Sequence, residues 1–265
     1  MMLRFLILVL VLFLPSGLWA DEACGLDTPC VLGDRSYHLR VPDGWDGKTP
    51  MPVVLHFHGW QRQGSLVVNH NRLASATRKR GVLLVAPNGQ RRTWNFWTSD
   101  TDDVGFAKAV LEDVAARYPI DPERVYISGY SYGSAMAWRY VCETGDGVAA
   151  LLAIAGSISQ EEDCAEAPAE VRHVHGLDDT VMTFPMGPGG DETYPVALWR
   201  AHYGCGDGAA LGDWQQREFL TLSRTQWECD GGRVTLDLHP GGHFIPHGWL
   251  ARQLDELLGL PFSYP

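Results

Sequence analysis

Residues 125–137 contain the feature that most restricts how this chain can fold. An apolar, β-branched run leads into the G-x-S-x-G pattern of residues 129–133, and small residues typical of a helix follow. The turn is so tight that a side chain at either glycine would collide with the neighbouring strand or helix. We therefore expect a strand, a sharp turn and a helix, with Ser131 strained and exposed at the carboxyl end of a sheet.

Short β-branched or aliphatic runs alternate with amphipathic stretches along the rest of the chain. This alternation is typical of an α/β fold, in which helices cover both faces of a mostly parallel central sheet. The clearest helix spans residues 103–118, because apolar side chains recur at three- and four-residue steps and Pro119 ends the run. The predicted strands are residues 37–41, 53–57, 82–86, 124–128, 150–154, 171–175 and 234–238; the further predicted helices are residues 134–141, 194–203 and 247–258.

The first twenty residues predict a secretory signal peptide. Ten uninterrupted apolar residues, 5–14, precede small residues and a cleavage site after Ala20. A membrane-spanning helix needs about 20 apolar residues, so the alternative of a membrane anchor is disfavoured. Residues 21–265 show no linker, repeat or shift in composition, and we expect one catalytic domain that is exported to the periplasm or the medium.

The six cysteines are an even number in a chain that is expected to be oxidised after export. Six cysteines allow 15 connectivities, but neighbours in sequence close the shortest loops. A structural metal site is disfavoured because no C-x-x-C pair occurs. The predicted disulfides are Cys24–Cys30, Cys142–Cys164 and Cys205–Cys229.

The net charge indicates which partners the protein can bind, but not which reaction it catalyses. The chain has 21 Lys and Arg against 32 Asp and Glu, a formal net charge of −11. Such a surface repels nucleic acid and anionic lipid, so we expect neither a nucleic-acid partner nor stable membrane association.

A serine hydroxyl needs a base and a group that orients the base before it can act as a nucleophile. Asp178 and Asp179 follow a predicted buried strand, and His243 follows a glycine pair after the last predicted strand. We choose Asp179 as the acid, because in an H-G-x-x-D pattern the acid comes three residues after the glycine. The chain order Ser131, Asp179, His243 then matches the order of α/β-hydrolases.

Other polar clusters suggest metal ligands, but each has a plainer interpretation. The glycines and proline at residues 240–242 break any helix that would align His239, His243 and His247, and we expect His247 to help start the last helix. His56 and His58 fit a strand end that packs against a loop. Asp100, Asp102 and Asp103 fit the acidic start of a helix, with Asp103 near the cap. No metal is predicted.

Two backbone N–H groups are candidates for an oxyanion hole. One belongs to Tyr132, which opens the helix after the serine, and the other to Trp60, in the His-Gly-Trp sequence that ends a predicted strand. Trp94, Trp97 and Tyr130 are candidate substrate contacts. The alternative for the tryptophans is a loop that buries its own rings.

Taken together, these stretches resemble the secreted polyhydroxybutyrate depolymerase and feruloyl esterase group of the α/β-hydrolase superfamily. The resemblance spans about residues 30 to 250. It implies the α/β-hydrolase fold, the same nucleophile, acid and base at Ser131, Asp179 and His243, and a similar disulfide arrangement. The matching stretches are residues 58–60, 94–95, 103–106, 121–126, 129–133, 175–181 and 241–243.

The resemblance predicts a secreted serine esterase without a cofactor. Tyr132 departs from it, because these enzymes usually have a small residue there, and no polymer-binding module follows Leu258. We therefore expect a monomer that acts on hydroxyalkanoate oligomers, feruloyl-type esters or small aryl and alkyl esters. The alternatives are a serine peptidase, an acyltransferase or a non-catalytic binding protein on the same fold.

Overall fold

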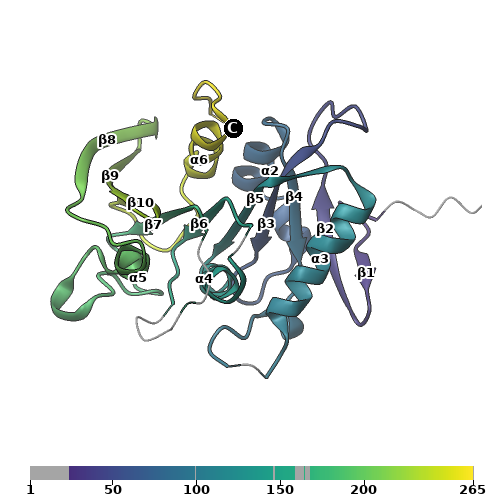
Figure 1. Ribbon diagram of the computed structural model, residues 1–265, viewed down its shortest axis with the longest axis horizontal. Helices are drawn as coiled ribbons and strands as arrows, with labels where there is room; N and C mark the ends of the chain where they lie inside the picture. Colours follow the sequence, from purple (N-terminus) through teal and green to yellow (C-terminus); the bar gives the residue numbers. More distant parts are fainter. Residues whose placement is uncertain (1–23, 99, 146, 159–163, 165–167, 265) are drawn as a thin grey trace, which may run out of the picture.

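A sheet of ten strands forms the centre of the molecule in the computed structural model, which describes residues 24–98, 100–145, 147–158, 164 and 168–264 (Figure 1). The strand order is β1-β2-β4-β3-β5-β6-β7-β10-β9-β8. The strands are β1 (Cys30–Leu32), β2 (Arg35–Arg40), β3 (Met51–Phe57), β4 (Leu83–Pro87), β5 (Ile120–Tyr130), β6 (Ala150–Ile154), β7 (Glu170–Gly176), β8 (Ala209–Arg217), β9 (Leu220–Cys229) and β10 (Gly232–His239).

The middle of the sheet is parallel and its edges are antiparallel. The pairs β4–β3, β3–β5, β5–β6, β6–β7 and β7–β10 run parallel, whereas β1, β2, β9 and β8 join as antiparallel strands. All seven residues of β3 and all five of β6 are buried, as expected for strands covered on both faces. The predicted fold class, α/β with a mostly parallel central sheet, is confirmed.

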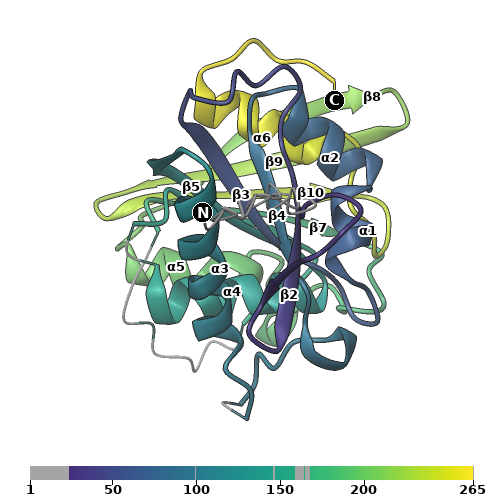
Figure 2. The same cartoon turned by 90° about the vertical axis from the view of Figure 1, so that its right-hand side faces the viewer.

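Helices cover both faces of this sheet (Figure 2). One layer consists of α1 (Gly64–Val68), α2 (Asn71–Arg78) and α6 (Trp249–Leu258). The other consists of α3 (Asp103–Arg117), α4 (Tyr132–Thr144) and α5 (Ala197–His202). Each layer packs its apolar side chains on the sheet as a separate core. Short 3-10 helices span Gln90–Arg92, Pro188–Gly190 and Tyr194–Val196.

Each predicted strand and helix has a counterpart in the structure, with shifted ends. The helix predicted at residues 194–203 is divided into a 3-10 turn and α5. The last helix begins at Trp249 after Gly248, and His247 instead approaches the Tyr264 hydroxyl with its Nδ1 at 3.0 Å. At the start of α3, the capping side chain is Asp102, whose carboxylate accepts from the Gly105 N–H at 2.7 Å.

Three disulfides close short segments of the chain. They join Cys24 to Cys30, Cys142 to Cys164 and Cys205 to Cys229, with Cα–Cα distances of 4.8, 4.4 and 4.4 Å. These are the predicted pairs, and they are consistent with an oxidising compartment. The predicted signal peptide lies outside the described residues. In the described part of the chain, we find no helix with the length and apolar character needed to cross a membrane.

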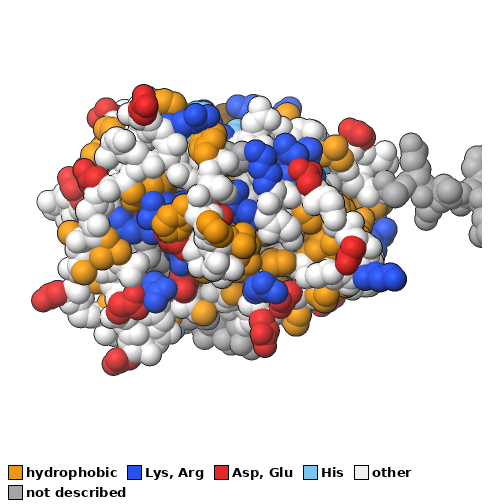
Figure 3. Space-filling view, turned by 90° about the horizontal axis from the view of Figure 1, so that it is seen from above, with side chains coloured by type: hydrophobic (Ala, Val, Ile, Leu, Met, Phe, Trp, Pro, Cys, Tyr) orange, Lys and Arg blue, Asp and Glu red, His pale blue; other side chains and the backbone are white. Residues whose placement is uncertain are grey.

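Charges are unevenly distributed over the face of the molecule that is seen from above (Figure 3). Lys and Arg side chains gather around the middle of this face, whereas most Asp and Glu side chains lie toward its rim. The excess of acidic residues in the sequence therefore does not make the whole surface uniformly acidic.

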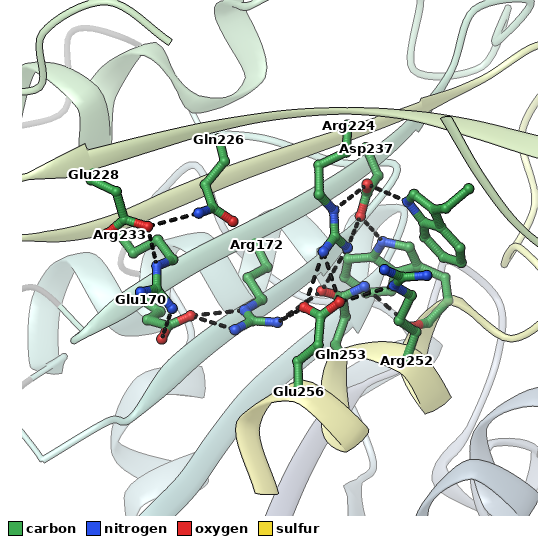
Figure 4. Close-up of polar contacts among 12 residues, drawn as sticks. Glu170, Arg172, Arg224, Gln226, Glu228, Arg233, Asp237, Arg252, Gln253 and Glu256 are labelled. Carbon is green, nitrogen blue, oxygen red and sulfur yellow. Dashed lines mark hydrogen bonds and ion pairs between the residues drawn. The ribbon is translucent and has the colours of Figure 1, made fainter. Parts of the chain in front are cut away.

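A network of buried ion pairs connects α6 to the sheet (Figure 4). Arg224 of β9 pairs with Asp237 of β10 at 2.8 Å and with Glu256 of α6 at 2.8 Å. Arg172 of β7 pairs with Glu256 at 2.6 Å and with Glu170 at 2.7 Å. Both arginine side chains are at most 6% exposed. Because buried charges are tolerated only when they are paired, the network requires all its members.

The buried carboxylate of Asp237 accepts four hydrogen bonds. Its carboxylate accepts from the indole N–H groups of Trp214 and Trp249 at 2.9 and 2.8 Å, besides two bonds from Arg224. Burial lowers the pKa of Arg224, but the hydrogen bonds and charges of Asp237 and Glu256 outweigh it, and the pKa is raised. Arg224 therefore stays charged inside the protein.

Candidate active site

The turn between β5 and α4 holds Ser131 in a conformation that L-residues rarely adopt. Its φ and ψ are 57° and −124°. A Cβ at Gly129 would lie 2.1 Å from the Gly133 carbonyl oxygen, and a Cβ at Gly133 would lie 2.1 Å from the Phe57 oxygen. The Ser131 N–H donates to Ile154 O at 3.0 Å, which anchors the turn to β6. This is the strained strand, turn and helix that the pattern predicts.

The expected exposure of Ser131 is wrong, because the residue is only 6% exposed. Gly156 lets the backbone close around it, and Gly59 lies at van der Waals distance. A Cβ at Gly59 would lie 3.6 Å from the Ser131 Cβ, and a Cβ at Gly156 would lie 2.4 Å from the Ser131 oxygen. The serine therefore lies between the ends of β3, β5 and β6.

Asp179 and His243 meet at the carboxyl ends of β7 and β10. His243 Nδ1 donates to Asp179 Oδ2 at 2.7 Å. The other carboxylate oxygen, Oδ1, accepts from the N–H groups of Val181 and Met182, both at 2.9 Å. The side chain of Asp179 is fully buried, whereas Asp178 is exposed. Of the two adjacent aspartates, only Asp179 therefore faces the histidine.

Backbone contacts hold the two loops together. The N–H of Leu177 donates to His239 O at 2.8 Å, and that of Asp178 donates to Gly241 O at 3.2 Å. Because β7 and β10 are neighbouring parallel strands, both loops leave the sheet at the same edge. This pairing brings residues 64 positions apart within hydrogen-bond distance.

His243 is held on its other side by Tyr130, the residue before the serine. The Tyr130 hydroxyl donates to the His243 backbone oxygen at 3.0 Å, and the two rings lie 4.9 Å apart. Because Nδ1 donates to Asp179, the neutral imidazole leaves Nε2 as its proton acceptor. Tyr130, predicted as a substrate contact, thus contacts the histidine.

A second histidine lies against Asp179 and was not singled out in the sequence. His175 Nε2 donates to Met182 O at 2.9 Å and lies 3.4 Å from Asp179 Oδ2, while its Nδ1 accepts from His173 Nε2 at 3.1 Å. Burial lowers the pKa of His175. The residue therefore stays neutral beside the carboxylate. Its position at the head of the H-G-x-x-D pattern was the available signal.

The loop after β3 carries the second predicted oxyanion donor, Trp60. Gln61 has a φ of 56°; its N–H donates to Arg92 O at 2.8 Å, and the Arg92 guanidinium donates back to Gln61 O at 2.7 Å. Within the described part of the chain, the Trp60 N–H has no hydrogen-bond partner. Tyr132 is the first residue of α4, so its N–H has no partner within the helix.

His58 fixes the start of this loop. Its Nδ1 donates to Gly59 O at 2.8 Å, and its Nε2 accepts from the Gly89 N–H at 3.0 Å. Burial is the main cause that lowers the pKa of His58, to about 4. A neutral ring with one donor and one acceptor satisfies both contacts. His58 thus packs the loop rather than offering a metal ligand.

The prediction that Trp94 contacts substrate is wrong. The residue is 1% exposed, its indole N–H donates to His58 O at 2.7 Å, and its ring packs edge-on against Phe57 at 5.0 Å. The loop buries this ring in the core, which was the alternative interpretation. Trp97, in contrast, is 60% exposed.

An aromatic group forms beside the serine instead. Phe96 packs edge-on against Trp97 at 4.5 Å and against Tyr132 at 5.1 Å. Tyr132, the large residue where the resembling group has a small one, is therefore part of an aromatic surface next to Ser131. We name Phe96, Trp97 and Tyr132 the aromatic rim.

The buried histidines predict that the protein loses stability in mild acid. Burial lowers the pKa of His56 to about 3 and the pKa values of His58 and His239 to about 4. In the unfolded chain these rings take up a proton near pH 6.5. Stability is thus fully present above pH 6.5 and is lost as the pH falls toward 4, by up to about 3 kcal/mol for His58 alone.

Urea unfolding between pH 7.5 and 4.5 tests this prediction through the midpoint of the transition. His58→Gln keeps a donor and an acceptor but does not titrate, so it should give a shallower decline than the wild type. A midpoint that does not change between pH 7.5 and 5 would contradict the prediction.

Several known proteins are similar to this chain. No family model matches the chain. Among curated proteins, the chain is 26% identical over 163 residues to a probable feruloyl esterase C of Aspergillus niger, covering 59% of each chain, and equally similar to feruloyl esterase C of Emericella nidulans. The chain is thus similar to feruloyl esterases C, at 26% identity. It spans 59% of the length of these two relatives.

Solved structures share the fold of this chain. An acetyl xylan esterase from Aspergillus awamori superposes with a TM-score of 0.63 at 14% identity, covering 87% of this chain and 95% of its own. A thermostable esterase superposes with a TM-score of 0.54 at 19% identity over 85% of this chain and 58% of its own. These neighbours are esterases with the α/β-hydrolase fold, which is also the fold of this chain.

Proposed function

We propose that this protein is a serine esterase in which Ser131 is the nucleophile, His243 the base and Asp179 the acid. The observation that carries the proposal is the 2.7 Å hydrogen bond between His243 Nδ1 and Asp179 Oδ2, together with the bond from the hydroxyl of Tyr130, the residue before Ser131, to His243 O at 3.0 Å. A buried carboxylate that fixes the tautomer of a histidine next to a strained serine is the arrangement that nucleophilic catalysis needs.

The proposed reaction is a double displacement. His243 Nε2 takes the Ser131 proton as Oγ attacks the ester carbonyl, and the N–H groups of Tyr132 and Trp60 stabilise the oxyanion. His243 then gives its proton to the departing alcohol, which leaves an acyl group on Ser131. Water, deprotonated by His243, releases the acid and restores the serine. No step needs a cofactor.

The substrates we propose are hydroxyalkanoate oligomers, feruloyl-type esters and small aryl or alkyl esters. Curated relatives include feruloyl esterases and a bifunctional acetylxylan esterase and xylanase of Neocallimastix patriciarum, 24% identical over 58% of this chain and 23% of its own. The aromatic rim offers apolar faces on which an aromatic acyl group can pack.

We propose that the protein acts outside the cytoplasm as a monomer with one catalytic domain. The three disulfides support an oxidising compartment. The apolar segment at residues 5–14, followed by small residues up to Ala20, supports removal of a signal peptide. Sizing of the exported protein and sequencing of its N-terminus would check both points.

A substrate panel tests the proposed reaction. We expect hydrolysis of p-nitrophenyl acetate, methyl ferulate or hydroxybutyrate oligomers, and covalent labelling of Ser131 by a fluorophosphonate probe, located by mass spectrometry of the labelled peptide. Cleavage of peptides without cleavage of esters would favour a peptidase. Faster transfer to an added alcohol than to water would favour an acyltransferase, and failure to label would favour a binding protein.

A further inference from the structure

A cavity of about 920 Å³ adjoins the candidate active site and plays no part in the reaction proposed above. Its wall includes Gly59 and Tyr130, the two residues packed beside Ser131, and Phe244, which follows His243. The remaining wall comes from the end of β3 and the loop after it, which carries Arg62, from α1, α2 and the residues between them, and from the segment after β10 and Tyr264. Because Ser131 itself does not line the cavity, a ligand there would occupy a neighbouring subsite rather than the reacting position.

The charge of the cavity is unusual for this chain. The chain carries a net charge of −11, yet no Asp or Glu is among the residues that line the cavity. Arg62 and Arg72 line it, and neither forms an ion pair with any described residue. Two guanidinium groups therefore face a shared space without a counter-charge from the described chain.

The positive charges of Arg62 and Arg72 affect the pKa of the neighbouring His70. Burial, Arg72 and Arg62 all lower the pKa of His70, and its Nδ1 is buried without a hydrogen-bond partner in the described structure. Burial also lowers the pKa of Arg72, and no carboxylate opposes the shift. The guanidinium of Arg72 is held in place by its bond to Ile245 O and by the ring of Phe244 at 5.8 Å. The cavity is thus preorganised for an anion.

The start of α2 adds donors to the same wall. Its capping position is His70, whose side chain makes no capping bond, and Asn71, Arg72 and Leu73 all line the cavity. The Leu73 N–H donates to His70 O at 3.0 Å, whereas the N–H groups of Asn71 and Arg72 have no partner in the described chain and favour negative charge. They supplement the two arginines, which remain the principal cations.

We propose that this cavity binds a carboxylate on the alcohol half of the ester substrate. In the proposed reaction, His243 protonates the departing alcohol, so the alcohol half lies on the side of His243, where Phe244 and Ile245 line the cavity. The aromatic rim, on Tyr132 and its neighbours, is then left for the acyl half. A planar guanidinium binds a carboxylate through two parallel hydrogen bonds, which makes a carboxylate the fitting anion.

This inference rests on the proposed esterase reaction. A pair of matched esters distinguishes failure of the carboxylate subsite from failure of the esterase reaction. The substrates are 3-acetoxypropanoate, whose alcohol half carries a carboxylate, and its methyl ester, which is neutral but has the same acetyl group. For each variant, the ratio of kcat/KM for the acid to kcat/KM for the methyl ester is measured at low ionic strength. Phenyl acetate serves as a reporter of esterase activity.

The wild type should prefer the acid, and Arg62→Met and Arg72→Met should each lower the ratio by about tenfold, the effect of losing one charged hydrogen bond. Arg91→Met removes the same charge from an exposed residue outside the cavity and should leave the ratio unchanged. Because Arg62 is exposed and its side chain bonds to no described residue, its loss should not disturb folding.

Three other results would each contradict the carboxylate subsite. Hydrolysis of phenyl acetate with equal ratios in the wild type and both cavity variants would overturn the carboxylate subsite and leave the esterase proposal standing. An equal fall in the ratio for Arg91→Met would show that the net charge of the protein, and not the cavity, sets the preference. Failure to hydrolyse any of the three esters, together with failure on methyl ferulate and hydroxybutyrate oligomers, would overturn the proposed function and the subsite with it.

Discussion

Ser131→Ala should lower kcat for p-nitrophenyl acetate by about 10⁴- to 10⁶-fold, the range seen when a member of a Ser-His-Asp triad is removed. The reason is that the Ser131 hydroxyl accepts the acyl group in the proposed reaction, and alanine has no hydroxyl. The midpoint of urea unfolding should stay nearly unchanged, because the strain of the turn lies in the backbone and alanine retains the Cβ. Initial rates and unfolding curves on the same preparation check both parts.

Ser134→Ala provides the matched control. Ser134 lies one turn further along α4, is fully buried and makes only a long hydrogen bond of 3.4 Å to Gly156 O. Its replacement makes the same chemical change at the same end of the helix, and activity should remain within a few-fold of the wild type. If Ser131→Ala keeps a comparable rate, the nucleophile lies elsewhere.

Arg224→Met should destabilise the protein by about 3–5 kcal/mol, the usual effect of removing one partner from a buried ion pair. The substitution leaves Asp237 without its cation inside the sheet, although Trp214 and Trp249 still donate to the carboxylate. It also deprives Glu256 of one of its arginines, which loosens α6 on the sheet. The measurement is the free energy of unfolding in urea, followed by tryptophan fluorescence.

Arg233→Met is the control for burial. Arg233 pairs with Glu228 at 2.8 Å and with Glu170 at 3.3 Å, but its side chain is 40% exposed and that of Glu228 is 64% exposed. Water screens such pairs, and the loss should be about 0–1 kcal/mol. Equal losses in the two variants would mean that burial of the network contributes nothing.

The parallel centre of the fold could be predicted because its strands carry the simplest signal. Strands covered on both faces are almost entirely apolar, as in β3 and β6, and such runs stand out from their surroundings. The antiparallel hairpin of β8 and β9 carries no such run. β8 is exposed along most of its length, and β9 alternates buried residues such as Leu220 and Leu222 with more exposed ones.

The helices that escaped prediction are short or polar. α1 has five residues, and α2 has the sequence NRLASATR, in which only Leu73 is a large apolar residue. Packing against the sheet, not intrinsic preference, keeps such segments helical. Both line the cavity beside Ser131, so the sequence could not indicate that this cavity exists.

In the candidate site, local sequence patterns predicted which residues meet, but they did not predict which side chains are buried. The spacing in H-G-x-x-D distinguished Asp179 from Asp178, because the backbone of the turn decides which carboxylate points inward. Nothing in the sequence separated Trp94 from Trp97. One ring is buried against Phe57 and the other faces solvent, and that difference depends on how the loop after β4 folds over β3.

The contact of Gly133 with the end of β3 has one more consequence. Its Cα packs against the carbonyl oxygens of Phe57 and His58, so that an added Cβ would lie within 2.4 Å of both. The helix that begins with Tyr132 and the loop that carries Trp60 are therefore in direct main-chain contact. The side chains of Phe96 and Trp97 take no part in that contact. Substitutions of these two side chains therefore change the surface beside Ser131 without changing the contact that sets the spacing of the two proposed N–H donors.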